Sequence, residues 1–138
     1  WTPKTQYAVT TNLATTITSS GALDQAAITT TVAQSGRYAI SCHLYTQTNA
    51  SGTIMSMILR TGNSTYTSAT QRAYSYGDSN YSPSGYQVSL SIDPTIVWLN
   101  AGESIHLGVL APAPSGTVKV FGDSDIVGAT QLTFIRIE

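Results

Sequence analysis

The chain has 138 residues, of which only 9% are charged, and its formal net charge is −1. An average soluble protein has about 25% charged residues, so hydroxyl and amide groups must keep this surface in water, and no long-range field attracts nucleic acid or an anionic membrane. The length suits one domain spanning residues 1–138 with a core of its own. No apolar run approaches the ~20 residues that a membrane-spanning helix needs.

Short Thr-rich and alternating runs predict strands along the whole chain. In chain order, the predicted strand segments are 5–18, 27–32, 36–45, 53–60, 71–76, 87–93, 104–110, 117–121 and 130–137. Turn-forming Gly, Asn, Pro and Ser residues separate most of them. Because no segment of useful length has helical periodicity, the chain is predicted to be all-β, as an antiparallel sandwich or barrel.

The segment 36–45 is predicted to be a central strand with one face in the core. Tyr38, Ile40, Cys42 and Leu44 alternate there with other residues, at the period of two that a half-buried strand shows. Cys42 is the only cysteine, so no intrachain disulfide can form. Its apolar neighbours predict a buried, unreactive thiol.

The order of several short motifs resembles that of the C1q and tumour-necrosis-factor-like (TNF-like) jelly-roll superfamily. The motifs are Gly36-Arg37-Tyr38 at the entry of the central strand, the strand ending in a turn at residues 60–63, the turn LNAGESI at 99–105 and the closing strand 130–137. The resemblance implies an antiparallel jelly-roll β-sandwich of about ten strands. It also implies a homotrimer whose subunit contact is lined by the sheet holding the N-terminal, central and C-terminal strands.

The sequence departs from this family in three ways. Phe134-Ile135 stands where the family usually has a second glycine, the N-terminal third is unusually rich in Thr, and no collagen-like Gly-x-y stalk is present. These departures place the chain away from the secreted vertebrate members of the family. We therefore expect a head domain from the C-terminal part of a longer fibrous protein, such as a phage tail fibre, a spike or a bacterial surface appendage.

The closing strand is apolar on both faces. Leu132 and Phe134 share one face, and Ile135 and Ile137 share the other. Burying a large apolar side chain contributes ~1.5–3 kcal/mol, so contact between copies of the chain would stabilise the second face. The alternative is that the two isoleucines pack under the N-terminal segment of the same chain. The residues predicted to line the trimer contact are Tyr7, Val9, Tyr38, Ile135 and Ile137.

Motifs for chemistry are sparse, and we expect neither catalysis nor a cofactor. His43 and His106 alternate with the apolar positions of two strands, which predicts surface or interface histidines rather than a zinc pair. Asp123 and Asp125 are spaced like part of a calcium loop, but the glycine and distal glutamate of a complete loop are missing. No Gly-x-Ser-x-Gly motif marks a nucleophilic serine.

The long, tyrosine-rich stretch at residues 74–86 predicts a binding surface. Tyrosine offers broad contact area at low entropic cost, and the Ser, Gly and Asn residues around it adapt their hydrogen bonds. Tyrosine rings could stack on sugar rings while Asp and Asn side chains bond to hydroxyl groups. The alternative is that the tyrosines cover the edge of the sandwich. The predicted ligand-binding residues are Tyr74, Tyr76, Asp78, Asn80, Tyr81 and Tyr86.

The sequence therefore predicts an extracellular or virion-surface receptor-binding and adhesion module. In this prediction, the chain is a homotrimeric, non-catalytic head that recognises a cell-surface glycan or protein, without nucleic-acid binding or membrane insertion. Two alternatives stay open. One is a structural trimerisation domain at the tip of a fibre, and the other is a secreted C1q-like ligand.

Overall fold

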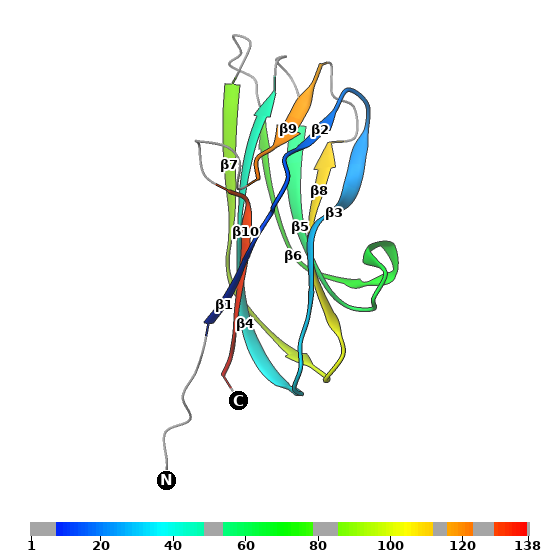
Figure 1. Ribbon diagram of the computed structural model, residues 1–138, viewed down its shortest axis with the longest axis vertical. Helices are drawn as coiled ribbons and strands as arrows, with labels where there is room; N and C mark the ends of the chain where they lie inside the picture. The colour runs from blue at the N-terminus through cyan, green and yellow to red at the C-terminus, as the bar shows by residue number, and fades with distance from the viewer. Residues whose placement is uncertain (1–7, 49–53, 79–85, 112–115, 123–128, 138) are drawn as a thin grey trace.

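The chain folds into two antiparallel β-sheets packed face to face, as the computed structural model in Figure 1 shows. The structure describes residues 8–48, 54–78, 86–111, 116–122 and 129–137. Ten strands and one short 3-10 helix lie in these residues, which confirms the all-β prediction and its strand number. The elements are β1 (Ala8–Asn12), β2 (Ile17–Ser19), β3 (Leu23–Thr31), β4 (Gly36–Thr48), β5 (Ile54–Gly62), η1 (Tyr66–Ser68), β6 (Thr70–Asp78), β7 (Tyr86–Leu99), β8 (Ser104–Ala111), β9 (Val118–Val120) and β10 (Gln131–Arg136).

The first sheet, called sheet A here, is built around β4. One edge of β4 pairs with β10 and, further along, with β9, while its other edge pairs with β7. Strand β1 pairs with the outer edge of β10, and β2 pairs with β9. Strands from both ends of the chain therefore lie in the same sheet as the central strand, as the family resemblance implied.

The second sheet, called sheet B here, has the strand order β3-β8-β5-β6, so β3 and β6 are its edge strands. Strands β4, β6 and β8 end, and β5 and β7 begin, at the end of the sandwich drawn at the top of Figure 1. The first residues of β1 and the last residues of β10 lie at the opposite end.

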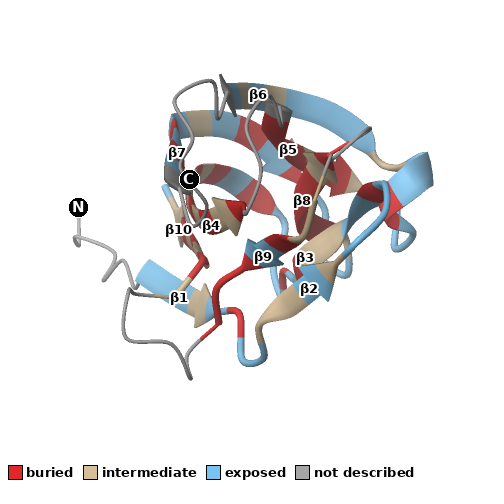
Figure 2. Cartoon of the chain, turned by 90° about the horizontal axis from the view of Figure 1, so that it is seen from above, coloured by how far each residue is buried: buried red, intermediate tan, exposed pale blue. Residues whose placement is uncertain are grey.

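The core lies between the sheets, where Figure 2 shows the buried positions gathering. Alternation produces this arrangement, because successive side chains of a strand point to opposite faces. On β4 the even-numbered positions from Gly36 to Thr48 are all buried, and the positions between them are half-buried or exposed. Cys42 is one of the buried positions, which confirms its predicted place in the core. On β8, Ile105, Leu107 and Val109 are fully buried against sheet A.

Strand β7 is longer than the sequence predicted. The alternating pattern indicated a strand at 87–93, whereas β7 continues through Pro94 to Leu99. Proline lacks the N–H group that a central strand needs, and in sheets it is confined to edges and bulges. Strand β7 pairs with β4 alone, and its register shifts where Pro94 lies opposite the break between Ile40 and Cys42. The edge position and the bulge accommodate the proline.

Candidate functional site

The outer face of sheet A, which points away from the core, carries an apolar stripe at one end. Directly opposed residues of an antiparallel pair share a face. Ile135 is paired with Ala8 on one side and with Ala39 on the other, and Ala39 is paired with Ile96. The four residues form one apolar row across four strands. Trp98 and Ile137 lie two positions along from Ile96 and Ile135, on the same face, and the exposed Arg37 of β4 lies between them. We call the six apolar residues the sheet A stripe.

The stripe is exposed where it reaches β7. The side chains of Ile96 and Trp98 are 51% and 57% exposed, and Ile137 is also exposed. The indole Nε1 of Trp98 lies 3.4 Å from the Asn100 Oδ1, as a weak donor to it. Large apolar groups that stay in water on one sheet face mark an interaction surface more often than scattered single residues do.

Further along, the same face becomes polar. The hydroxyl groups of Thr10 and Thr133 are hydrogen-bonded across β1 and β10 at 2.9 Å. The ring of His43 stacks on that of Tyr45, with 4.3 Å between the ring centroids, and the His43 Nδ1 lies 3.2 Å from the Ser91 Oγ. The predicted surface or interface position of His43 fits this half-buried place on the outer face.

Four of the five predicted interface residues fall into three groups. Ile135 and Ile137 belong to the stripe, and β1 lies beside β10 in the sheet, so the described N-terminal residues do not cover them. Val9 is exposed but is paired with the buried Phe134, which places it at the edge of the core face. Tyr7 lies outside the described residues.

The position of Tyr38 in the structure differs from the one that the sequence analysis predicted. Its side chain is only 4% exposed, packs edge-on against Phe134 and donates from its hydroxyl to the Gln34 carbonyl oxygen at 2.6 Å. Alternation places Tyr38 with Ile40 on the core face, so its side chain points away from the outer face that carries the sheet A stripe. Sequence reasoning also missed Ile96 and Trp98. Their alternation with the buried Val97 and Leu99 was the available signal.

A second exposed aromatic group lies on sheet B, at its edge strand β6. Tyr74 and Tyr76 are 51% and 65% exposed, their ring centroids are 5.9 Å apart, and their planes are 28° from parallel. Both project from the outer face, because their partners on β5, Ile58 and Ser56, alternate with the fully buried Met55 and Met57. We call Tyr74 and Tyr76 the tyrosine pair.

The remaining predicted ligand residues cannot be placed in the same detail. Asp78 ends β6 and Tyr86 begins β7, so their backbones lie at the same end of the sandwich, but their side chains are outside the described part. Asn80 and Tyr81 lie outside the described residues. The structure thus brings Tyr74 and Tyr76 together and leaves the rest of the predicted site as a prediction.

His106 is buried, not at the surface as the alternation predicted. Its side chain is 1% exposed on the outer face of sheet B, beneath the segment that holds η1. The His106 Nε2 donates to the Asn63 carbonyl oxygen at 2.8 Å, and its Nδ1 is hydrogen-bonded to the Thr29 hydroxyl at 2.9 Å. Tyr66 packs edge-on against the ring. A loop folded over the sheet therefore covers this histidine, and strand periodicity carries no signal for such a loop.

Tyr66 holds that loop against sheet B through charged neighbours. Its hydroxyl donates to the Asp24 Oδ1 at 3.3 Å, and its ring lies 4.5 Å below the Arg60 guanidinium carbon. The Arg60 Nη1 also donates to the Tyr66 carbonyl oxygen at 3.1 Å. Burial, and then the Asp24 carboxylate, raise the pKa of Tyr66 to about 12. The contacts of Tyr66 with Asp24 and Arg60 stabilise the loop, although the buried Arg60 Nε has no hydrogen-bond partner among the described residues.

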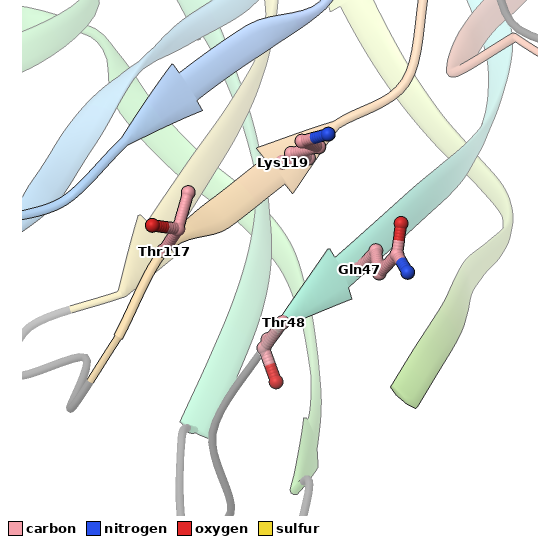
Figure 3. A pocket seen from close by; sticks show the side chains of 4 residues that line it. All are labelled: Gln47, Thr48, Thr117 and Lys119. Carbon is pink, nitrogen blue, oxygen red and sulfur yellow. The ribbon is translucent and has the colours of Figure 1, made fainter. Parts of the chain in front are cut away.

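A shallow hollow lies near the upper end of sheet A, between the ends of β4 and β9 (Figure 3). Its volume is about 270 Å³, and it is lined by Gln47, Thr48, Thr117 and Lys119. This volume falls just below the ~300–1,000 Å³ of common small-molecule pockets. All four lining residues are polar or charged.

The described residues contain no group of three or more His, Cys, Asp or Glu side chains that could hold a metal ion. Asp123 and Asp125, the weak calcium candidates, lie outside those residues. Within the same described part, no helix is long and apolar enough to cross a membrane.

The two sheets, with β1, β10, β4 and β7 in one and β3, β8, β5 and β6 in the other, define a TNF-like jelly-roll sandwich. Among solved structures, the chain is similar to the TNF protein Eiger from S. frugiperda, with a TM-score of 0.69 over 98% of this chain and 94% of that chain. The sequence identity is 11%, so the likeness concerns the fold. It confirms the predicted jelly roll. No protein-family sequence model and no curated protein sequence matches the chain.

Proposed function

We propose that this chain is a non-enzymatic receptor-binding and adhesion module, which works as a homotrimer outside the cell or on the surface of a virion. The sheet A stripe joins the copies, and the exposed edge of sheet B is left to meet a cell-surface target. The observation that carries the proposal is the exposure of Ile96 and Trp98 on the same sheet face as Ile135 and Ile137.

The energetics of the stripe favour association. A large apolar side chain that moves from water into a packed contact contributes ~1.5–3 kcal/mol. The described core between the sheets is already filled by other residues, so folding of one copy leaves Ile96 and Trp98 in water. A closed ring of copies would bury them, and rings with cyclic symmetry are common among homo-oligomers.

Two further observations support a binding role outside the cell. The scarcity of charge suits a surface that avoids non-specific electrostatic contacts. The fold is shared with a TNF protein. The two histidines do not form a shared catalytic site, because His43 lies on the outer face of sheet A and His106 is hydrogen-bonded on sheet B.

Sedimentation velocity over a range of concentrations tests the assembly. We expect a species of three times the 14.6 kDa chain mass at micromolar concentration. The variant Ile96→Lys should shift the equilibrium to the monomer while the circular-dichroism spectrum stays β-rich. The matched control is Thr31→Lys, which adds the same charge at an exposed position of β3 and should leave the trimer intact. A folded wild-type monomer at high micromolar concentration would contradict the proposal.

Binding to cells that carry candidate receptors, measured with the labelled trimer, tests the second half of the proposal. Saturable binding that depends on the trimer supports a receptor-binding head. A stable trimer that binds no cell, glycan or protein would instead support a structural trimerisation domain.

A further inference from the structure

We propose that the tyrosine pair, Tyr74 and Tyr76, is a stacking platform for an uncharged, linear oligosaccharide. The inference rests on the proposed function, since it names the chemical class of the target. It also assigns the contact to the outer face of β6 at the edge of sheet B.

The two rings are arranged to meet a ligand with successive flat faces. They lie 5.9 Å apart and within 28° of parallel, and both are at least half exposed. Neighbouring sugar rings in a linear glycan are spaced on a similar scale and present C–H faces that pack against aromatic rings. One ligand chain that lies along the strand can therefore contact both tyrosines, and the phenol hydroxyls can donate to sugar hydroxyls at the rim.

The platform is held in place before any ligand arrives. Both tyrosines are on a regular strand that is paired with β5 along this stretch, and the buried Ser56 hydroxyl lies 3.5 Å from the Tyr74 Oη. Side chains fixed by a strand and by each other lose little further freedom on binding. A rigid aromatic surface therefore retains more of its contact energy as affinity.

In the part of the chain that the structure describes, the charged side chains near the pair are engaged by groups of the same chain, which favours an uncharged ligand. On the outer face of sheet B, the Asp24 carboxylate accepts from the Tyr66 hydroxyl, and the Arg60 guanidinium lies over the Tyr66 ring. Both of these charged groups, on β3 and β5, are thus engaged by Tyr66. Arg72 precedes the pair on β6, and its Nε donates to the Thr61 Oγ1 at 2.9 Å. The neighbours of the pair on β5 are Ser56 and Ile58, which carry no charge.

The tyrosine side chains project from the face of the sheet, and this direction favours a glycan over a peptide that would add a strand at β6. A peptide that extended sheet B at β6 would lie in the plane of the sheet and bond to the β6 backbone. The tyrosine rings stand out of that plane, so such a peptide would not need their faces. A ligand that uses both ring faces lies across the outer surface of the sheet.

The test uses the wild-type trimer on an array that carries neutral and acidic glycans, followed by calorimetry with the strongest neutral binder and its shorter fragments. We expect neutral linear glycans to bind, and affinity to rise steeply between one sugar and two or three. Tyr76→Leu should weaken binding about tenfold, because it keeps an apolar group and removes the ring. Tyr76→Phe keeps the ring and should bind within about threefold of wild type.

Several outcomes would overturn the inference and leave the proposed function in place. One is a trimer that binds only acidic glycans and loses them on Arg72→Ala or at high salt. Another is a trimer that binds a protein target equally well with Tyr76→Leu. Equal glycan affinity of Tyr76→Leu and wild type would also overturn it. A monomer that nevertheless binds neutral glycans through the pair would support the platform and refute the trimer.

Discussion

The phenol ring of Tyr66 occupies the space above Gly108 where any larger residue would place its side chain. A Cβ atom built on Gly108 would overlap the Oη, Cζ and Cε2 atoms of Tyr66. Gly108 is on β8, in the middle of sheet B, and Tyr66 is on η1. A glycine in the centre of a sheet thus allows a loop to lie directly on the strand and to cover the neighbouring His106.

Replacing this glycine should destabilise the protein. Gly108→Ala forces Tyr66 away from Asp24 and Arg60, and overpacking of this kind costs about 1–3 kcal/mol. Urea unfolding followed by fluorescence measures the change. The control is Gly21→Ala, because a Cβ there has no atom within 4 Å, so that variant should unfold close to wild type. Adding Gly108→Ala to a Tyr66→Ala background should lower the free energy of unfolding much less than it does in wild type, because the overlapping ring is gone. An equal loss in both backgrounds would refute the overlap.

The Cys42 thiol should be inert in the folded protein. Burial raises its pKa from 9.0 to about 12, so almost no reactive thiolate exists at pH 8. Iodoacetamide at pH 8 should leave the native chain unmodified and should alkylate it fully in 6 M urea, as intact mass spectrometry would show. Rapid labelling of the native protein would mean that the core around β4 opens often.

Alkaline pH should loosen the loop over sheet B before it unfolds the sandwich. The pKa of Tyr66 is raised by burial and by Asp24 to about 12, above its ordinary value of 10.0. The neutral phenol is therefore favoured in the folded state. Its contribution to stability is complete below pH 10 and is lost as pH rises from about 10 to 12. NMR of ring-labelled tyrosine should show Tyr66 ionising late, and Asp24→Asn should lower its pKa only in part, because burial remains.

The two faces of β10 should respond differently to truncation. Leu132 is fully buried between the sheets, so Leu132→Ala should cost about 2–5 kcal/mol at any protein concentration. Ile137 is exposed on the other face, so Ile137→Ala should change the free energy of unfolding of the monomer little and should weaken only association. Chemical unfolding and sedimentation at several concentrations separate these effects. A large, concentration-independent loss in Ile137→Ala would show that this residue stabilises the single chain.

The sequence predicted the strands best where alternation was regular. The run from Tyr38 to Leu44 indicated both the strand β4 and its buried face. The family resemblance then suggested Tyr38 as an interface residue, and the structure agrees with the alternation instead. A period of two assigns a side chain to one face of the sheet directly. A family resemblance assigns it only through an alignment, and an error in that alignment moves the residue to the wrong face.

The sequence could not predict what covers each face. Alternation places His106 opposite the core residues Ile105 and Leu107, and the structure agrees about the face. Its burial depends on Tyr66 and the segment around η1, which return over the sheet from a distant part of the chain. Such long-range cover leaves no local periodic signal. The same is true of Trp98, which stays exposed because none of the described residues folds over it.

Strand β10 lies between β1 and β4, although it is the last strand in chain order. Phe134 there is paired with Ile40 from the first third of the sequence. Such distant pairings close slowly, because a long stretch of chain must be ordered before the contact forms. During synthesis, the edge of β4 that receives β10 stays open until this strand leaves the ribosome. We therefore expect shortened translation products that lack it to be prone to aggregation and to depend on chaperones.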